Sequence, residues 1–332
     1  MTKIPVLVTG GAGYIGSHAV LALIDAGWPV AVIDDLSNGS RSVVPDSVPF
    51  YEGSVADRGL VDRIFAEQGI SAIMHFAGSI VVPESVDKPL DYYRNNTLAT
   101  HSLLSAAVAA GVPHFVFSST AAVYGAPERV PIGEDASTLP INPYGSSKLM
   151  TEQMLRDTAA AYPINYAALR YFNVAGADAQ GRSGQIGKGS THLIKVAVEA
   201  ATGKRGHIEV FGTDYPTPDG SCIRDYIHVT DLADAHVKAL EHLIDSPWQD
   251  LVLNCGYGHG LSVLEVIDTL DSLLDAPLRR ELKPRRAGDP PQLVSANGAI
   301  RETLDWRPRF DDIRTIVGDA LAWERHLQET QA

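Results

Sequence analysis

The sequence predicts an α/β protein in which a doubly wound parallel sheet is followed by a smaller, less regular α/β cap domain. The first observation is that short, continuously apolar runs alternate with amphipathic stretches, because continuous apolarity is typical of strands buried on both faces. The second is that this rhythm loosens after Arg170 into long glycine-rich loops over 178–189 and 212–221. Loops of that length in a compact domain are usually functional. We therefore expect a first domain over 1–170 and a second, substrate-binding domain over 171–332.

The elements follow in order along the chain. Strands are expected over 6–8, 30–33, 50–55, 72–74 and 115–117. Helices are expected where apolar residues recur at spacings of three and four, over 13–25, 57–68, 91–110 and 144–162. Gly27, Gly69 and Gly111 follow three of these helices as C-terminal stops. A helix over 229–245 and a strand over 251–253 could return to the main sheet, so the two domains are expected to be partly interleaved.

Composition excludes several classes of protein. The 332 residues carry 27 Lys and Arg against 40 Asp and Glu, a net charge of −13, which argues against a general nucleic-acid binder. Cys222 and Cys255 have neither zinc-site nor redox spacing, so no metal site is predicted and both thiols are expected to be free and buried. No apolar window is long enough for a signal peptide or a membrane helix. We expect a cytoplasmic protein without membrane contacts.

A glycine turn follows the first strand. Gly10, Gly13 and Gly16 lie between that strand and the first helix, where they allow a tight turn, the approach of a pyrophosphate to backbone N–H groups, and close packing of helix on strand. Alone, such a turn can lack any ligand. Asp34 ends the second strand about 20 residues further on, where its carboxylate can accept both ribose hydroxyls of adenosine and would repel a 2′-phosphate. The pair predicts a Rossmann site for NAD rather than NADP.

The fourth strand runs into His75, Phe76, Ala77 and Gly78. The small residues Ala77 and Gly78 at a strand's carboxyl end would let a cofactor lie close to the backbone. A histidine beside an apolar strand is more often a hydrogen-bonded core residue than a ligand, so we assign His75 no chemistry.

Tyr144 and Lys148 lie four residues apart on one face of a helix that begins after Pro143. A cation beside a phenol favours the phenolate, so the pair predicts a tyrosine with a lowered pKa that can act as a general base for an alcohol proton. The alternative is a Tyr/Lys pair on a solvated helix face. Thr120 ends the fifth strand, where ligands bind in such sheets, and can bridge a substrate oxygen to the tyrosine.

These residues resemble the extended short-chain dehydrogenase/reductase superfamily, and most closely its UDP-glucose 4-epimerase family. The stretches that carry the closer resemblance are 8–18, 75–78, 83–86, 92–96, 170–173, 211–216 and 224–229. Members of that family hold NAD tightly and invert the hydroxyl at sugar C4 through a transient 4-keto sugar. The resemblance implies UDP-galactose and UDP-glucose as substrates and no external redox partner.

The resemblance also implies roles for particular residues. Tyr144 would be the base, assisted by Thr120, and Lys148 would lower its pKa and bind the nicotinamide ribose. The other implied cofactor contacts are Gly10, Gly13, Tyr14, Ile15, Gly16, Asp34, Asp35, Asn38, Ser54, Val55, Phe76, Ala77, Gly78, Asn96 and Tyr171. The implied substrate contacts are Thr120, Tyr144, Asn173, His192, Leu193, Arg224, Tyr226, Arg286 and Asp289.

Four positions depart from the family pattern. Ile80 stands where many epimerases have a lysine near the cofactor, and Ser54 replaces the aspartate expected near the adenine, so looser cofactor retention is possible. His192 replaces an asparagine of the substrate loop. Leu293 stands where a bulky tyrosine excludes N-acetyl sugars and a small residue admits them. Its intermediate size leaves UDP-hexoses alone, or UDP-hexoses with their N-acetyl analogues, as open alternatives.

Other functions stay open on the same scaffold. Dehydratases and decarboxylases need acidic groups after the strand-end threonine, where this chain has Ala121 and Ala122. A net dehydrogenase, or a non-catalytic NAD-binding sensor, is compatible with the fold. Similar epimerases pair their long helices between two subunits, so the helices over 91–110 and 144–162, the first rich in alanine and leucine, imply a homodimer by resemblance. The alternative for them is plain packing on the sheet.

Overall fold

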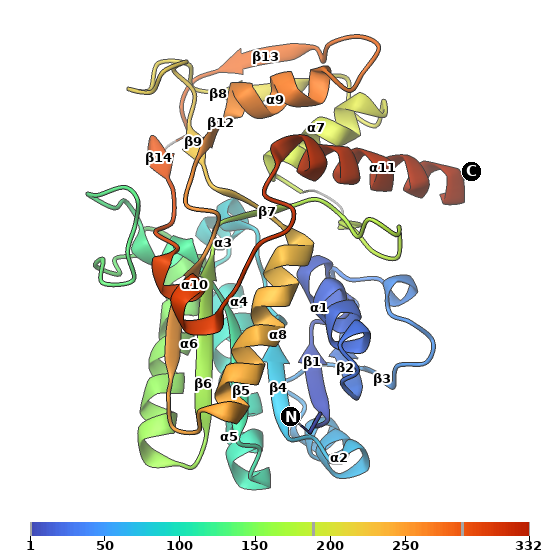
Figure 1. Ribbon diagram of the computed structural model, residues 1–332, viewed down its shortest axis with the longest axis vertical. Helices are drawn as coiled ribbons and strands as arrows, with labels where there is room; N and C mark the ends of the chain where they lie inside the picture. The colour runs from blue at the N-terminus through green and yellow to red at the C-terminus, as the bar shows by residue number, and fades with distance from the viewer. Residues whose placement is uncertain (1, 188–189, 287–288, 332) are drawn as a thin grey trace.

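The computed structural model describes residues 2–187, 190–286 and 289–331. Its centre is a seven-stranded parallel sheet with the order β11-β6-β5-β4-β1-β2-β3, which confirms the predicted fold class (Figure 1). The strands are β1 (Val6–Thr9), β2 (Val30–Asp34), β3 (Phe50–Glu52), β4 (Ala72–His75), β5 (His114–Thr120), β6 (Asn165–Tyr171) and β11 (Leu251–Cys255). Strand order reverses between β1 and β4, and ligands bind at such a switch point in open α/β sheets.

Helices cover both faces of the sheet. One face carries α2 (Arg58–Gln68), α5 (Ala99–Ala110) and α6 (Pro143–Ala161), and the other carries α1 (Tyr14–Asp25), α8 (Val229–Asp245) and α10 (Gly298–Leu304). Alternate strand residues serve the two faces, as Val6 and Val8 join the core under α1 and α8 while Leu7 joins the core under α2 and α5. This double burial is why the strands read as continuous apolar runs.

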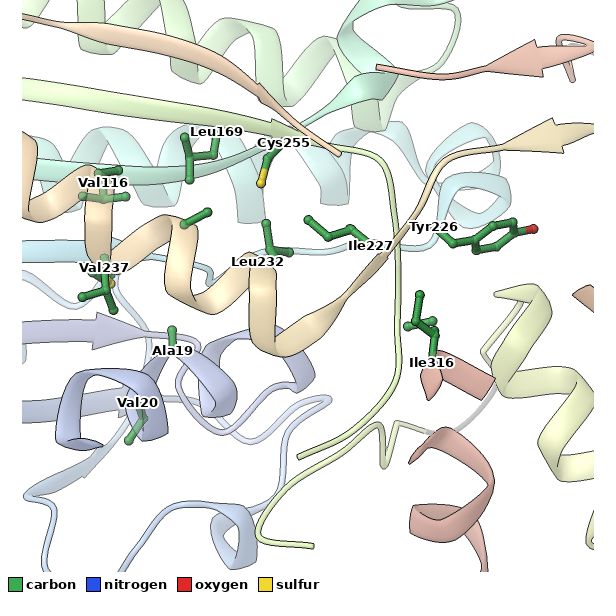
Figure 2. Packing of buried hydrophobic residues seen from close by; sticks show 14 of the residues in the cluster. Ala19, Val20, Val116, Leu169, Tyr226, Ile227, Leu232, Val237, Cys255 and Ile316 are labelled. Atoms are coloured by element: carbon green, nitrogen blue, oxygen red, sulfur yellow. The ribbon is translucent and has the colours of Figure 1, made fainter. Parts of the chain in front are cut away.

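The core between the sheet and the second helix layer is built from both halves of the chain. Figure 2 shows Val237 of α8 between Val116 and Leu169 of the sheet and Ala19 of α1. Ala19, Val116 and Leu169 are fully buried. Helix α8 therefore belongs to the main sheet although it lies beyond residue 170.

The second lobe lies above the carboxyl ends of the strands in Figure 1. It contains small sheets in the pairings β10-β7, β12-β9-β14 and β13-β8. Its elements are β7 (Asn173–Ala175), α7 (Leu193–Ala201), β8 (Ile208–Phe211), β9 (Ile223–Arg224), β10 (Tyr226–His228), β12 (Leu261–Ser262), α9 (Val263–Asp271), β13 (Arg280–Lys283), β14 (Gln292–Leu293) and α11 (Ile313–Gln331). Helix α8 and strand β11 lie between these elements in the sequence but belong to the main sheet, and the predicted division into two domains stays a prediction.

The helix predicted over 91–110 is wrong in detail. It consists of α4 (Pro89–Tyr92), a π-helical turn η2 (Tyr93–Leu98) and α5, and it is preceded by a short helix α3 (Val82–Asp87). Two 3₁₀ turns, η1 (Arg41–Val43) and η3 (Ala121–Tyr124), complete the elements. Across the described part of the chain, no helix combines the length and apolarity needed to cross a bilayer.

Candidate active site

The glycine turn after β1 is tightly enclosed by backbone. Gly10 has φ +68°, and a Cβ there would lie 2.6 Å from the Ala77 N. A Cβ at Gly16 would lie 2.1 Å from the Gly10 carbonyl oxygen, whereas one at Gly13 would meet that oxygen at 3.2 Å. Gly13 is the N-cap of α1 and supplies no side-chain cap. The turn thus leaves the first backbone N–H groups of α1 beside a cradle without side chains, which fits a dinucleotide pyrophosphate.

Asp34 lies at the carboxyl end of β2, beside this turn. Its two carboxylate oxygens accept hydrogen bonds from the backbone N–H groups of Ala12 at 2.9 Å and Leu36 at 2.8 Å. Burial raises the pKa of Asp34, and the two backbone donors act against that rise. The neighbouring Asp35 and Asn38 are exposed, with Asp35 accepting from the Ser37 N–H. Asp34 is therefore held in one orientation before any ribose is bound.

The loop after β4 is anchored from the π-helical turn. Asn96 accepts from the Ser79 N–H at 2.7 Å and donates to the Ser79 carbonyl and the Ser147 hydroxyl, each at 3.0 Å. Its amide thus holds the loop containing Gly78 against α6. The spacing of apolar residues does not predict this π-helical turn. The predicted direct contact of Asn96 with the cofactor stays a prediction.

His75 is a core residue, as predicted. Its ring nitrogens share hydrogen bonds with the hydroxyls of Thr9 and Thr100, both at 2.7 Å, and the ring stacks on Phe117. Burial, with the nearby Lys148 charge, lowers the pKa of His75 to about 3. The ring is neutral at ordinary pH.

The remaining cofactor positions lie around the same edge of the sheet. Phe76 and Ala77 follow β4 and are half-buried, and Ile15 packs partly buried against the core. After β3, Val55 is buried, while Ser54 is exposed and its hydroxyl accepts from the Ala56 N–H at 3.2 Å.

The catalytic candidates meet where β5, β6 and α6 converge. Asn142 caps α6 by accepting from the Gly145 N–H at 2.8 Å, which places Tyr144 in the first turn. Lys148 donates to the Ser118 carbonyl at 3.0 Å, and Thr120 contacts Tyr144 through its hydroxyl. Tyr171 is the register partner of Thr120 on β6. The structure thus brings the predicted triad together, with Tyr171 beside it, in buried surroundings rather than on a solvated helix face.

The titration of this cluster differs from the prediction. Burial raises the pKa of Tyr144 well above its ordinary value, with Tyr171 acting in the same direction and Thr120 against it. Burial lowers the pKa of Lys148 to about 8, although the charge of Glu152 acts to raise it. The predicted lowering of the Tyr144 pKa is therefore wrong, because desolvation of the buried phenol outweighs the hydrogen bond from Thr120 that acts to lower it.

The substrate candidates lie in the second lobe, on two of its small sheets. Asn173 of β7 and Tyr226 of β10 are register partners, and so are Arg224 of β9 and Leu293 of β14. Tyr226 and Arg224 are buried. Leu293 packs against the apolar cluster that contains Tyr124 and Phe172, next to the strand-end hydroxyls of β5.

Two of the predicted substrate contacts in the second lobe are cations. The Arg224 guanidinium lies 3.7 Å from the Asp289 carboxylate, so these predicted UDP contacts are adjacent. The Arg286 guanidinium stacks on the Phe211 ring at 3.8 Å. Phe211 opens the stretch 211–216 that carries the family resemblance, but no role in the site was predicted for it.

The two substrate candidates next to α7 are more exposed than Arg224 and Tyr226. His192 is exposed and lies 3.2 Å from the Gln185 side-chain nitrogen, and Leu193 is half-buried at the start of α7. Neither touches the Tyr144 cluster directly among the interactions that the structure records.

The two lobes meet at the glycine turn. The Tyr14 hydroxyl donates to the Gly176 carbonyl at 2.7 Å, and the Ser17 and Ser183 hydroxyls share a hydrogen bond of 2.6 Å. Both contacts join α1 to the loop between β7 and α7. Tyr14, predicted as a cofactor contact, therefore also closes the lobe interface, which no local pattern could show.

Comparisons with known proteins agree with this arrangement. Residues 6–256 match the NAD dependent epimerase/dehydratase family. A UDP-glucose 4-epimerase of Azospirillum brasilense is 59% identical over 325 residues, which cover 98% of this chain and 93% of the relative.

Solved structures give the same result. A UDP-glucose-4-epimerase from Stenotrophomonas maltophila, with bound NAD and formylated UDP-arabinopyranose, superposes with a TM-score of 0.95 at 37% identity over 99% of this chain and 100% of the other. The UDP-Glc/GlcNAc 4-epimerase of Campylobacter jejuni gives 0.85 at 43% identity over 98% and 100%. With the glycine turn, Asp34 and the Tyr144 cluster in place, the chain belongs to the NAD dependent epimerase/dehydratase family and, within it, to the UDP-glucose 4-epimerases.

Proposed function

We propose that this protein interconverts UDP-galactose and UDP-glucose with NAD as a cofactor that is regenerated in each turnover. The observation that carries the proposal is the buried cluster of Tyr144, Lys148 and Thr120 at the carboxyl edge of the sheet, between the glycine turn and the lobe that bears Arg224 and Arg286. Similarity to UDP-glucose 4-epimerases over nearly the whole chain supports it.

Tyr144, Thr120 and Lys148 would each have a different role in the reaction. Tyr144 would take the proton of the sugar 4-hydroxyl and return it, with the Thr120 hydroxyl between the two oxygens. Lys148 would hold the nicotinamide ribose and favour the phenolate. NAD, when bound, would supply hydride acceptance and return at C4 and a second positive charge near Tyr144. Because burial raises the pKa of Tyr144, the positive charges of Lys148 and of bound NAD would have to favour the phenolate.

Binding of the nucleotide would fall to the second lobe. Arg224 and Arg286 are suited to a diphosphate because guanidinium groups bind phosphate oxygens in pairs. Asn173, Tyr226, Asp289, His192 and Leu193 would complete the site. These residues would hold the nucleotide in place while the sugar turns over within the site.

The range of sugars would be set beside Leu293. Its contact with the cluster around Phe172, and its place opposite Arg224, put it where the sugar and the diphosphate would meet. Its intermediate size is compatible with UDP-hexoses alone and with UDP-hexoses together with their N-acetyl analogues.

Exposed apolar side chains on neighbouring helices support a homodimer. Within the apolar run 103–110, Leu103, Leu104, Ala106 and Ala107 pack into the core of the sheet. A different set of apolar side chains is exposed on the neighbouring helices: Val86 of α3, Leu90 of α4, Leu98 of η2 and Met150 of α6. We propose that this apolar face pairs with its symmetry copy. We also propose that the protein works in the cytoplasm, where its two unpaired thiols would stay reduced.

One assay tests the activity. Purified protein, without added NAD, is given UDP-galactose, UDP-glucose or their N-acetyl analogues, and both the epimer and NADH are measured. We expect epimer formation without accumulation of NADH, and a loss of at least about a thousandfold in Tyr144→Phe. Tyr162→Phe, which alters an exposed tyrosine at the end of α6, is the matched control. Steady NADH production would instead indicate a net dehydrogenase.

A further inference from the structure

A buried ion pair lies below the catalytic cluster. The Glu152 carboxylate accepts from Arg170 Nε at 3.0 Å and from Arg170 Nη2 at 2.6 Å. The Ser119 hydroxyl donates to the same carboxylate at 2.5 Å. The side chains of Glu152 and Arg170 are 1% and 5% exposed. Burying two charges has a large desolvation cost, so a pair with this many hydrogen bonds needs an explanation beyond stability.

Glu152 continues the series of catalytic residues along α6. Tyr144, Lys148 and Glu152 follow one another at intervals of four, so they share a helix face. Three consecutive residues at the end of β5 contact these three side chains. Thr120 contacts Tyr144, and the Ser118 carbonyl accepts from Lys148. The Ser119 hydroxyl donates to Glu152. The ion pair therefore fixes the position of α6 along β5 and β6 one turn below the reacting groups.

The charged groups around Lys148 also indicate a role for Glu152. Among the described residues no carboxylate lies within ion-pair distance of its Nζ, which contacts the Ser118 carbonyl and lies 4.9 Å from the centre of the Phe117 ring. The titratable or charged groups packed around this region are Tyr92, Tyr144 and Tyr171, His75, Glu152 with Arg170, and Tyr124 with Glu134 beyond it. The four tyrosines and His75 are neutral at ordinary pH. Glu152 is thus the nearby anion, and Arg170 is the nearby second cation.

We propose that Glu152 is a positioning residue for the Tyr144–Lys148 pair: bound by Ser119 and Arg170, it sets the register of α6 on β5 and supplies the counter-charge that keeps Lys148 protonated. The inference rests on the proposed epimerase function. It gives Arg170 a defined part as well, because the guanidinium orients the carboxylate and offsets part of its charge.

The test is the pH profile of kcat/KM for UDP-galactose, measured on the full chain with saturating NAD. In Glu152→Gln, Lys148 loses its counter-charge, and we expect the alkaline limb to move down by about one pH unit, a tenfold loss at high pH. In Arg170→Gln, a cation is removed while the carboxylate stays, so the limb should move up. Glu152→Asp keeps the charge and should keep the limb near that of the parent.

Opposite shifts distinguish electrostatic positioning from simple loss of folding. Asp231→Asn is the matched control: this buried carboxylate of α8 accepts from the Tyr257 hydroxyl and from the N–H groups of Arg309 and Phe310, so its loss should lower stability without moving the limb. Unshifted limbs, or shifts of both variants in one direction, overturn the inference. If either variant fails to fold, as judged by thermal melting, the other decides alone. A parent chain that epimerises no UDP-hexose contradicts the proposed function instead.

Discussion

The backbone N–H of Ala12 donates to the Asp34 carboxylate at 2.9 Å, so the residue predicted to bind the adenosine ribose also supports the glycine turn. In Asp34→Asn one oxygen becomes a donor that faces either this N–H or that of Leu36. We expect NAD binding to weaken about 10- to 100-fold, because hydrogen bonds to a charged acceptor contribute about 1.5–3 kcal/mol.

Calorimetric titration of the cofactor-free protein with NAD and NADP checks this. The parent should prefer NAD strongly, and the variant should lose most of that preference with the loss of the negative charge. Asp46→Asn removes an exposed carboxylate and should leave both affinities unchanged. Comparable affinities of the parent for NAD and NADP would show that Asp34 does not select the cofactor.

Leu293 is expected to set the substrate range. Leu293→Ala should raise the rate with UDP-N-acetylglucosamine relative to UDP-galactose by on the order of tenfold, because the removed atoms open space for the acetamide group. Leu293→Tyr should lower the same ratio. Leu282→Ala, at an exposed leucine of β13, is the control. Equal ratios in all four proteins would contradict a gate at Leu293.

His75 should contribute to acid sensitivity. Its pKa is lowered to about 3 in the folded chain, below the ordinary value of 6.5, so folding favours the neutral ring. The stability it confers is present above pH 6.5 and is lost as the pH falls toward 3. Between pH 6.5 and 5 the loss should be about 2 kcal/mol.

Urea unfolding at the two pH values measures this loss. His75→Gln can still hydrogen-bond Thr9 and Thr100 but does not titrate, so its free energy of unfolding should fall less than that of the parent on acidification. His101→Gln, at an exposed histidine of α5, should behave like the parent. Parallel losses in the parent and His75→Gln would assign the acid sensitivity to other groups.

The apolar face should control assembly. Leu90 is 79% exposed at the start of the helical segment that includes η2 and α5, and Leu90→Asp would place two charges at a symmetric contact. We expect the parent to sediment as a dimer and the variant as a monomer at the same concentration. Trp248→Asp changes a residue that is 71% exposed in the loop between α8 and β11 and should remain dimeric. A monomeric parent would remove this face from consideration.

The main sheet could be predicted from sequence because its strands are buried on both faces, which leaves a direct apolar signal in runs such as 6–8. The π-helical turn could not. A turn widened by one residue hardly alters apolar spacing, and it is stabilised by contacts of Asn96 with Ser79 and Ser147 that are distant in sequence. The exposed apolar face was missed for a related reason, since composition alone cannot say which apolar residues a sheet covers.

The candidate site, too, could be predicted only in part from the sequence. Spacing placed Tyr144 and Lys148 on one helix face, and strand-end position placed Thr120 beside them. The direction of the Tyr144 pKa shift could not be read from that spacing, because it depends on burial of the phenol in the fold and on Tyr92 and Tyr171, which come from other elements. Spacing and strand-end position in the sequence therefore predicted which residues form the cluster, but not their protonation.

Strand β11 has a consequence for biosynthesis. It pairs with β6 along its full length, from Leu251 to Cys255, although β6 ends at Tyr171. A nascent chain that has emerged only through β6 would present an unpaired, apolar strand edge, the kind of surface that promotes association with other chains. That edge is covered only after some eighty further residues have left the ribosome, so the main sheet cannot finish folding before about half of residues 171–332 have been synthesised.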